Sequence, residues 1–237
     1  MDSISFLGCG SWGGALGDVL SRKGVPVIFW HRNSNTIDKI QKTRKHYLVE
    51  DLEFSNNVKF TNDISFAIDS SPIIVLAIPS QSIRKLVMEN NNIFSNKKII
   101  VTVSKGIEVD SLLTISEVIN DVYGKNYKRT VVLSGPSHAE EVIKKFPTTL
   151  VAASKNDRAS KTIQKLFSNE YLRTYLNRDV KGVEIGGAMK NVMAIAAGIC
   201  DGINYGDNSK AALMTRGMTE IIRLGKKWVR KARHSVD

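Results

Sequence analysis

The feature that most constrains the fold is a glycine-rich turn near the start of the chain, in the stretch ISFLGCGSWGGAL. Four glycines fall within seven residues, directly after a short apolar run. Residues 3–8 are typical of a buried strand, residues 11–23 of a helix and residues 26–30 of a second strand. In such a βαβ unit the turn predicts a site for a dinucleotide pyrophosphate, although on its own it would also suit a plain strand–turn–helix joint.

Each glycine of this turn has a physical task in a phosphate site. Gly8 permits the tight turn, Gly10 lets a pyrophosphate approach the backbone, and Gly13 or Gly14 lets the helix pack closely on the strand. The amides around Ser11 and Trp12 open the helix, so we expect them to donate to phosphate oxygens.

The rest of the chain alternates strand and helix patterns. Apolar runs that predict further strands lie within residues 69–77, 99–103, 130–135 and 148–154, and helical patterns lie in residues 33–45, 110–122 and 157–167. This alternation predicts an α/β fold with a Rossmann-like, doubly wound, mostly parallel sheet.

The pattern changes near Asp179. Residues 183–224 contain helix formers interrupted by glycine, and the polar loop 204–208 divides them into two helices, with Asn208 as the expected N-cap of the second. We therefore expect a dinucleotide-binding domain over residues 1–180 and the start of an all-α domain over residues 181–237.

Composition limits the function classes. We find no uninterrupted apolar stretch of membrane-spanning length and no secretory leader, and two cysteines give no disulfide framework or metal cluster, so we expect a cytoplasmic protein without a membrane span or metal. The net charge of +11 admits nucleic acid as a partner. Because the lysines are dispersed, we favour a smaller anionic ligand, such as a phosphorylated metabolite or NADP.

Two basic sites follow predicted strands. His31 and Arg32 stand where an NAD-preferring site usually carries Asp or Glu. Arg32 could pair with a 2′-phosphate, which would favour NADP, or belong to a solvated turn. Lys105, in VSKG, follows a strand at the edge where ligands bind in such sheets, and is a candidate contact for a substrate anion or the cofactor.

Two further candidates lie on helices. Ser137 is expected to cap the helix that follows SGPS, with Glu140 completing a capping box. Lys190 has Gly186, Gly187 and Ala194 among its helical neighbours three and four residues away. Such a lysine faces either a ligand, as the buried proton donor of a catalytic site, or a close helix crossing.

The segments GCGSWGGAL, VSKG, SGPSHAEEV, GVEIGGAMKNVMAIAAGICDG and GDNSKAALMTRGMTEI closely resemble the bacterial NAD(P)-dependent glycerol-3-phosphate dehydrogenases, in order from residue 4 to about residue 225. The resemblance implies reversible hydride transfer between NAD(P)H and dihydroxyacetone phosphate, giving sn-glycerol 3-phosphate for phospholipid synthesis. It leaves the choice between NAD and NADP open. The positions that match cofactor contacts are Ser11, Trp12, Arg32, Lys105 and Ala139, those that match substrate contacts are Lys105, Gly135 and Ser137, and Lys190 matches the catalytic lysine.

The resemblance ends near Gly225. The family continues with Gly-Asp-Leu and Ser-Arg-Asn segments that help to bind the substrate, whereas this chain closes on KKWVRKARHSVD. We therefore expect an incomplete helical domain whose exposed apolar face, within residues 188–224, favours a homodimer. The alternatives are an inactive cofactor-binding remnant of the enzyme and, on charge alone, a nucleic-acid-binding protein.

Overall fold

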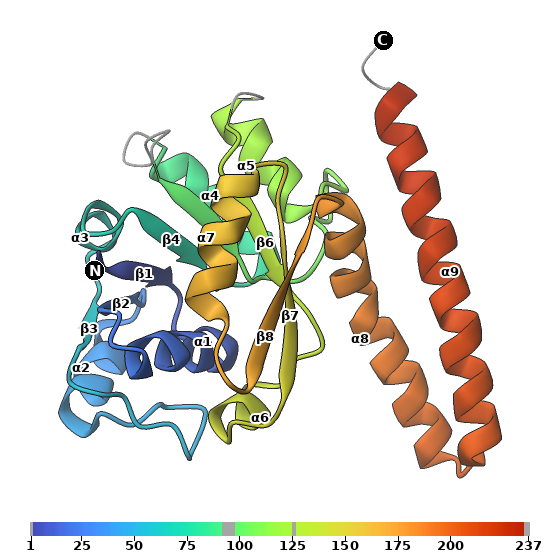
Figure 1. Ribbon diagram of the computed structural model, residues 1–237, viewed down its shortest axis with the longest axis horizontal. Coiled ribbons are helices and arrows are strands. Elements are labelled where there is room, and N and C mark those ends of the chain that lie inside the picture. Colours follow the sequence, from blue (N-terminus) through green and yellow to red (C-terminus); the bar gives the residue numbers. More distant parts are fainter. Residues whose placement is uncertain (1, 92–97, 125–126, 235–237) are drawn as a thin grey trace.

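The computed structural model describes residues 2–91, 98–124 and 127–234. An eight-stranded sheet with the order β3-β2-β1-β4-β5-β6-β7-β8 forms its centre (Figure 1). The strands are β1 (Ile4–Leu7), β2 (Val27–Trp30), β3 (Val58–Thr61), β4 (Ile73–Leu76), β5 (Ile99–Thr102), β6 (Thr130–Ser134), β7 (Thr148–Ala153) and β8 (Leu172–Asn177). The helices are α1 (Ser11–Arg22), α2 (Ser34–Thr43), α3 (Ile64–Asp69), the 3₁₀ turn η1 (Ser80–Ser82), α4 (Ile83–Glu89), α5 (Ile115–Tyr123), α6 (Ala139–Ile143), α7 (Asp157–Phe167), α8 (Val180–Gly202) and α9 (Gly206–His234).

The direction of the strands decides where the chain's loops meet. Strands β1 to β6 run parallel to one another, β7 runs antiparallel to β6, and β8 is parallel to β7. The loops after β1, β4, β5 and β6 therefore share one edge of the sheet. The chain order reverses between β1 and β4, and open α/β sheets bind ligands beside such a reversal.

The sheet is covered on both faces. Alternate residues of β1 show this, because Phe6 belongs to the core packed by α1, α6 and α7, and Leu7 to the core packed by α3, α4 and α5. Burial on both faces explains the nearly continuous apolar composition of the central strands.

Helices α8 and α9 form an antiparallel hairpin beyond the last strands of the sheet (Figure 1). The helices cross closely at Gly217, where a Cβ atom would lie 2.0 Å from Cε of Met193. By length and hydropathy alone α8 could span a membrane, and only 11% of its apolar window is buried. Its first turns are nevertheless fixed to the sheet domain by ionic and hydrogen-bonded contacts, described below.

The fold class expected from the sequence is confirmed, with differences in detail. The strands β3 and β8 and the helices α3 and α4 were not expected, because each is short and β8 alternates buried and exposed residues at the edge of the sheet. The helix expected from residue 110 begins at Ile115. Asn208 is not the start of the last helix, which begins at Gly206, a residue with a φ of 71°.

Candidate active site

The glycine turn has the geometry that close approach requires. Gly8 has a φ of 114°, and a Cβ atom there would lie 2.3 Å from the carbonyl oxygen of Ala77. At Gly13 a Cβ atom would lie 2.9 Å from both the Gly8 oxygen and the Ala77 Cβ atom. Any side chain at these two positions would therefore push the turn away from the end of β4. Gly14 and Gly17 allow α1 to pack closely on other side chains, because a Cβ atom would clash with His46 at Gly14 and with Phe29 at Gly17.

Gly10 differs from the other glycines because it faces open space. It is the N-cap of α1, it makes no side-chain cap, and nothing lies within 4 Å of its Cβ position. The first amides of a helix have no partner within the helix, so those of Ser11 and Trp12 are available to an anion. The buried indole Nε1 of Trp12 also has no partner among the described residues. This cradle fits the pyrophosphate of a dinucleotide.

A buried histidine supports the turn from behind. The Nδ1 atom of His46 accepts hydrogen bonds from the amides of Leu48 and Val49, at 3.0 and 3.1 Å, so the hydrogen is on Nε2, which donates to the Cys9 oxygen at 3.1 Å. Burial lowers the pKa of His46. Sequence reasoning missed this residue, because a lone histidine in a polar segment carries no periodic signal.

The basic pair expected near the cofactor lies at the end of β2. His31 is half-buried, with its ring packed edge-on to Tyr47 at 5.8 Å, and its Nδ1 accepts from the Asn33 amide at 3.2 Å. Arg32 is exposed. It is therefore free to reach a ligand at this edge of the sheet, where β1 and β2 end together.

Lys105 lies between the glycine turn and the loop after β6. Its ammonium is 5.9 Å from the centroid of the Trp12 ring and donates to the Gly135 oxygen at 3.4 Å. Burial, and then the nearby charge of Lys190, lower the pKa of Lys105. The structure thus brings together Trp12, Lys105 and Gly135, which the sequence placed in separate motifs.

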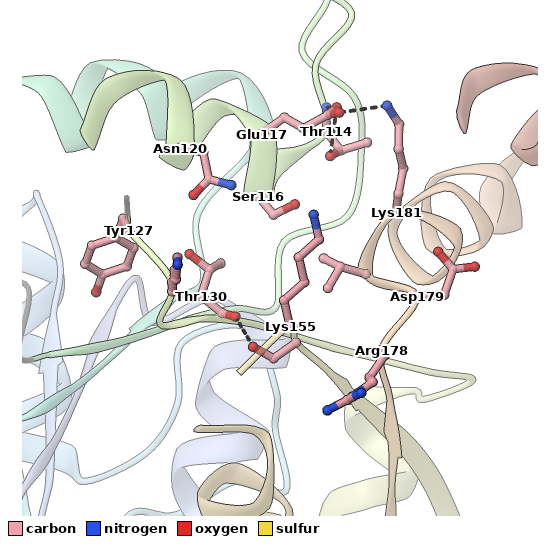
Figure 2. Close-up of a pocket in the computed structure, with 13 residues that line it drawn as sticks. Thr114, Ser116, Glu117, Asn120, Tyr127, Thr130, Lys155, Arg178, Asp179 and Lys181 are labelled. Atoms are coloured by element: carbon pink, nitrogen blue, oxygen red, sulfur yellow. Dashed lines mark hydrogen bonds and ion pairs between the residues drawn. The ribbon is translucent and has the colours of Figure 1, made fainter. Parts of the chain in front are cut away.

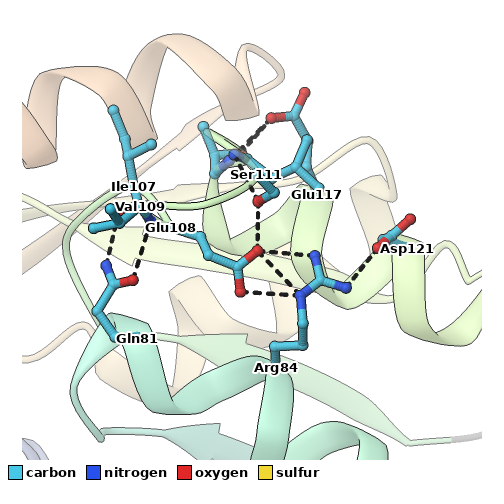
Figure 3. Close-up of polar contacts among 10 residues, drawn as sticks. Gln81, Arg84, Ile107, Glu108, Val109, Ser111, Glu117 and Asp121 are labelled. Atoms are coloured by element: carbon cyan, nitrogen blue, oxygen red, sulfur yellow. Dashed lines mark hydrogen bonds and ion pairs between the residues drawn. The ribbon is translucent and has the colours of Figure 1, made fainter.

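The loop that carries Lys105 is held by polar contacts from α4 and η1 (Figure 3). The guanidinium of Arg84 donates to both carboxylate oxygens of Glu108, at 2.9 to 3.0 Å, and to Asp121 at 2.6 Å. Gln81 donates to the Ile107 oxygen at 2.8 Å. These bonds restrain the loop immediately after Lys105, and Arg84 holds the pKa of Glu108 below its usual range.

A cavity of about 390 Å³ lies between the sheet and α8, and its lining includes Lys105, Gly135 and Lys190. Helix α8 approaches closely here, since a Cβ atom at Gly187 would lie 2.9 Å from Oγ of Ser134. Lys190 lines the cavity but is exposed, so its expected burial is wrong: the small neighbours on α8 serve the approach to the sheet and leave its side chain open.

Two other expected residues lie outside this lining. Ala139 is buried at the start of α6, and Ser137 donates to the Gly135 oxygen at 3.2 Å. The expected cap by Ser137 is wrong, because His138 is the N-cap of α6 and makes no side-chain hydrogen bond to the helix. The turn at Gly135 uses the Ser137 hydroxyl instead.

Helix α8 is fixed to α5 at its first turns. The buried carboxylate of Glu184 accepts from the amide and the hydroxyl of Ser116, at 2.7 and 2.6 Å. Lys181 pairs with Glu117 at 2.7 Å. Because Lys190 lies about two turns further along α8, these bonds set where it meets the cavity. Within the described residues, no group of His, Cys, Asp or Glu could hold a metal ion.

Comparison with known proteins agrees with this geometry. The N-terminal model of NAD-dependent glycerol-3-phosphate dehydrogenase matches residues 3–160, and the C-terminal model matches residues 179–236. The chain is 48% identical over 233 residues to glycerol-3-phosphate dehydrogenase [NAD(P)+] of Clostridium perfringens, covering 98% of this chain and 70% of that protein. It is 45% identical to the Staphylococcus epidermidis enzyme, covering 96% of this chain and 69% of that protein.

A solved structure is similar along nearly the whole chain. The crystal structure of glycerol-3-phosphate dehydrogenase from Coxiella burnetii superposes with a TM-score of 0.89 at 33% identity. The match covers 96% of this chain and 69% of that one.

Proposed function

This chain belongs to the NAD-dependent glycerol-3-phosphate dehydrogenase family, and from its site we infer that it interconverts dihydroxyacetone phosphate and sn-glycerol 3-phosphate with NAD or NADP. The observation that carries the proposal is the cavity in which Lys105 and Gly135 face Lys190, beside the phosphate cradle of α1. The family matches favour this dehydrogenase over a cofactor-binding remnant or a nucleic-acid-binding protein.

We propose that the cofactor lies along the ends of the central strands. The glycine turn and the first amides of α1, at Ser11 and Trp12, would hold its pyrophosphate, with Ala139 nearby on α6. Arg32 and His31 would hold the adenosine end. When bound there, a nicotinamide dinucleotide supplies or accepts the hydride.

The chain's own residues handle the substrate. Lys105 provides positive charge for the phosphate or the forming oxyanion, and Gly135 and Ser137 shape the turn beside it. Lys190 donates a proton to the developing alkoxide when the ketone is reduced, and takes it back in the reverse reaction. Its position on a helix that is fixed to α5 keeps the ammonium at the edge of the cavity.

We further propose that residues 1–180 and 181–237 act as the cofactor and substrate portions, in the cytoplasm. The cytoplasmic location is supported by the low cysteine content, two residues in 237. The contacts of α8 support a protein without a membrane span, because Glu184 and Lys181 near its start bind Ser116 and Glu117 of α5. The exposed apolar face of α8 and α9 supports a homodimer.

The direct test is oxidation of NADH and NADPH by the full chain with dihydroxyacetone phosphate, and with dihydroxyacetone as the control that lacks the phosphate. We expect turnover with the phosphate ester and a kcat/KM at least about 100-fold lower without it, because several charge-assisted hydrogen bonds are lost. Equal rates with both ketones would contradict the proposed substrate. An Arg32→Ala variant that loses NADPH but not NADH affinity would assign Arg32 to the 2′-phosphate.

A further inference from the structure

A second cavity lies away from the dehydrogenase site, between α5, the start of α8 and the last strands of the sheet (Figure 2). Its volume is about 750 Å³. Thr130, the first residue of β6, lines it, whereas Ser134 at the other end of β6 lines the active-site cavity. Four strand steps separate these residues by about 13 Å, so the two cavities are distinct.

The basic side chains that line the cavity outnumber its carboxylates, since Lys128, Lys155, Arg178 and Lys181 lie there with Glu117 and Asp179. Lys181 and Arg178 on its rim are paired with Glu117 and Asp157. Lys128 and Lys155, by contrast, form no ion pair with any residue in the described ranges 2–91, 98–124 and 127–234.

The two unpaired lysines flank adjacent strands, Lys128 just before β6 and Lys155 just after β7. Strand β6 pairs with β7 at Val132 and Ala153, and continuing that register by two residues places Lys155 beside Thr130. Lys128 lies two residues before Thr130. Figure 2 shows the Lys155 side chain crossing the cavity from Thr130 towards Ser116 on α5.

The same cavity contains polar atoms that need a partner. The amide Oδ1 of Asn120 and the hydroxyl of Thr130 are buried and make no hydrogen bond within the described part of the chain. Buried polar groups in native proteins are nearly always paired, with protein, water or ligand. Asn120 Oδ1 accepts a hydrogen bond, so its partner must be a donor such as a hydroxyl.

From this combination we propose that the cavity is a second ligand site, for a small phosphate ester that carries hydroxyl groups. The unpaired ammoniums of Lys155 and Lys128 bind the phosphate, and Asn120 and Thr130 bind the hydroxyls. The volume falls in the range of small-molecule sites and is far larger than a lone phosphate needs. The site does not depend on the proposed dehydrogenase function, because it shares no residue with that cavity.

The test is a titration of the ¹⁵N-labelled full chain with glucose 6-phosphate, inorganic phosphate and glucose, followed by NMR. With glucose 6-phosphate we expect saturable shifts of the Ser116, Asn120 and Lys155 amides. Inorganic phosphate should give the same shifts with weaker affinity, and glucose alone should give none. Because a charge-assisted hydrogen bond is lost, Lys155→Gln should weaken binding by about tenfold or more.

Matched variants make the result decisive. Lys42→Gln removes the same charge from the exposed face of α2 and should leave the affinity unchanged, whereas Asn120→Asp keeps the shape and should weaken binding through repulsion. Shifts confined to the Lys105 and Gly135 amides would overturn the proposal, as would equal affinities in Lys155→Gln and Lys42→Gln, or glucose binding as tightly as its phosphate.

Discussion

At the scale of single residues, the proposed chemistry depends on two lysines that line one cavity, Lys105 and Lys190. Lys105 is half-buried, and Lys190 adds a second positive charge nearby, so both effects lower the pKa of Lys105. An anionic substrate would remove this repulsion on binding. The same arrangement makes substrate affinity sensitive to pH.

The first prediction concerns that sensitivity. In the proposed mechanism protonated Lys105 binds the phosphate, and its pKa is below the usual 10.5. The KM for dihydroxyacetone phosphate should therefore start to rise in a pH range where an ordinary lysine is still charged. The measurement is a KM–pH profile of the wild type and Lys105→Arg, whose guanidinium stays charged and should flatten the rise. Identical profiles would contradict this role of Lys105.

The second prediction concerns His46 and stability. Burial lowers its pKa from 6.5, so the folded state keeps the ring neutral while the unfolded state takes up a proton below pH 6.5. The free energy of unfolding should therefore decrease as the pH falls through that value towards the lowered pKa. Denaturant midpoints between pH 8 and pH 5 test this, and His46→Asn should show a smaller pH slope, although it is less stable throughout.

At the scale of elements, the turn between β1 and α1 ends at an open glycine, Gly10, whereas α1 itself carries a packing glycine, Gly17. Gly17 lies against the Phe29 ring, where a Cβ atom would approach to 2.1 Å, while Gly10 faces open space. Substitutions at these two glycines should therefore affect stability and cofactor binding separately.

The third prediction uses that pair. Gly17→Ala should cost about 1–3 kcal/mol of stability through overpacking. Gly10→Ala should leave the denaturant midpoint nearly unchanged but weaken NADH binding by about tenfold or more, because its methyl group occupies the surface where the pyrophosphate approaches. Fluorescence titration with NADH and chemical denaturation give both numbers. A Gly10→Ala protein that binds NADH like the wild type would exclude the cradle.

The loop after β5 gives a fourth prediction. Arg84→Met removes the bidentate pair with Glu108 and frees the loop behind Lys105, so the KM for dihydroxyacetone phosphate should rise by about tenfold while the affinity for NADH changes little. Arg178→Met, which breaks an exposed bidentate pair with Asp157 away from this loop, is the matched control. Equal KM values in the two variants would show that the network does not position Lys105.

Sequence alone predicted the elements whose signal is local. The glycine turn and the apolar strands beside it identified β1, α1 and β2. The location of Lys105 beyond the end of β5 could also be read from the sequence, whereas its role stays a prediction. The Lys105–Trp12 contact, the His46 support and the second cavity depend on strand order and on the reversal at β7, which no local pattern carries. Lys190 shows what the sequence could not predict. Its small neighbours indicated that α8 packs closely on another element, but not that the Lys190 side chain itself stays exposed.

At the scale of the whole molecule, the sheet domain is well packed and the α8–α9 hairpin is not. Ile195 and Met214 are 66% and 64% exposed, and Val192, Ile199, Met218 and Ile222 are also at least half exposed. The chain spans 70% of the length of its Clostridium perfringens relative. An apolar surface of this kind favours association.

The fifth prediction follows from that surface. The full chain should associate in a concentration-dependent way in sedimentation experiments, and Ile195→Asp should shift it towards the monomer without changing its far-UV circular dichroism. Lys42→Gln is the control for a charge change on a distant surface. A monomer at every concentration would argue against the proposed homodimer.

The central claim is that Lys190 moves the proton in a reaction whose cofactor is held elsewhere. The most direct measurement is kcat for the reduction of dihydroxyacetone phosphate by the wild type and Lys190→Ala, together with the Kd for NADH. We predict that kcat falls by about 100- to 10,000-fold while the Kd changes by no more than about twofold. A Lys190→Ala enzyme that retains the wild-type kcat would contradict the account.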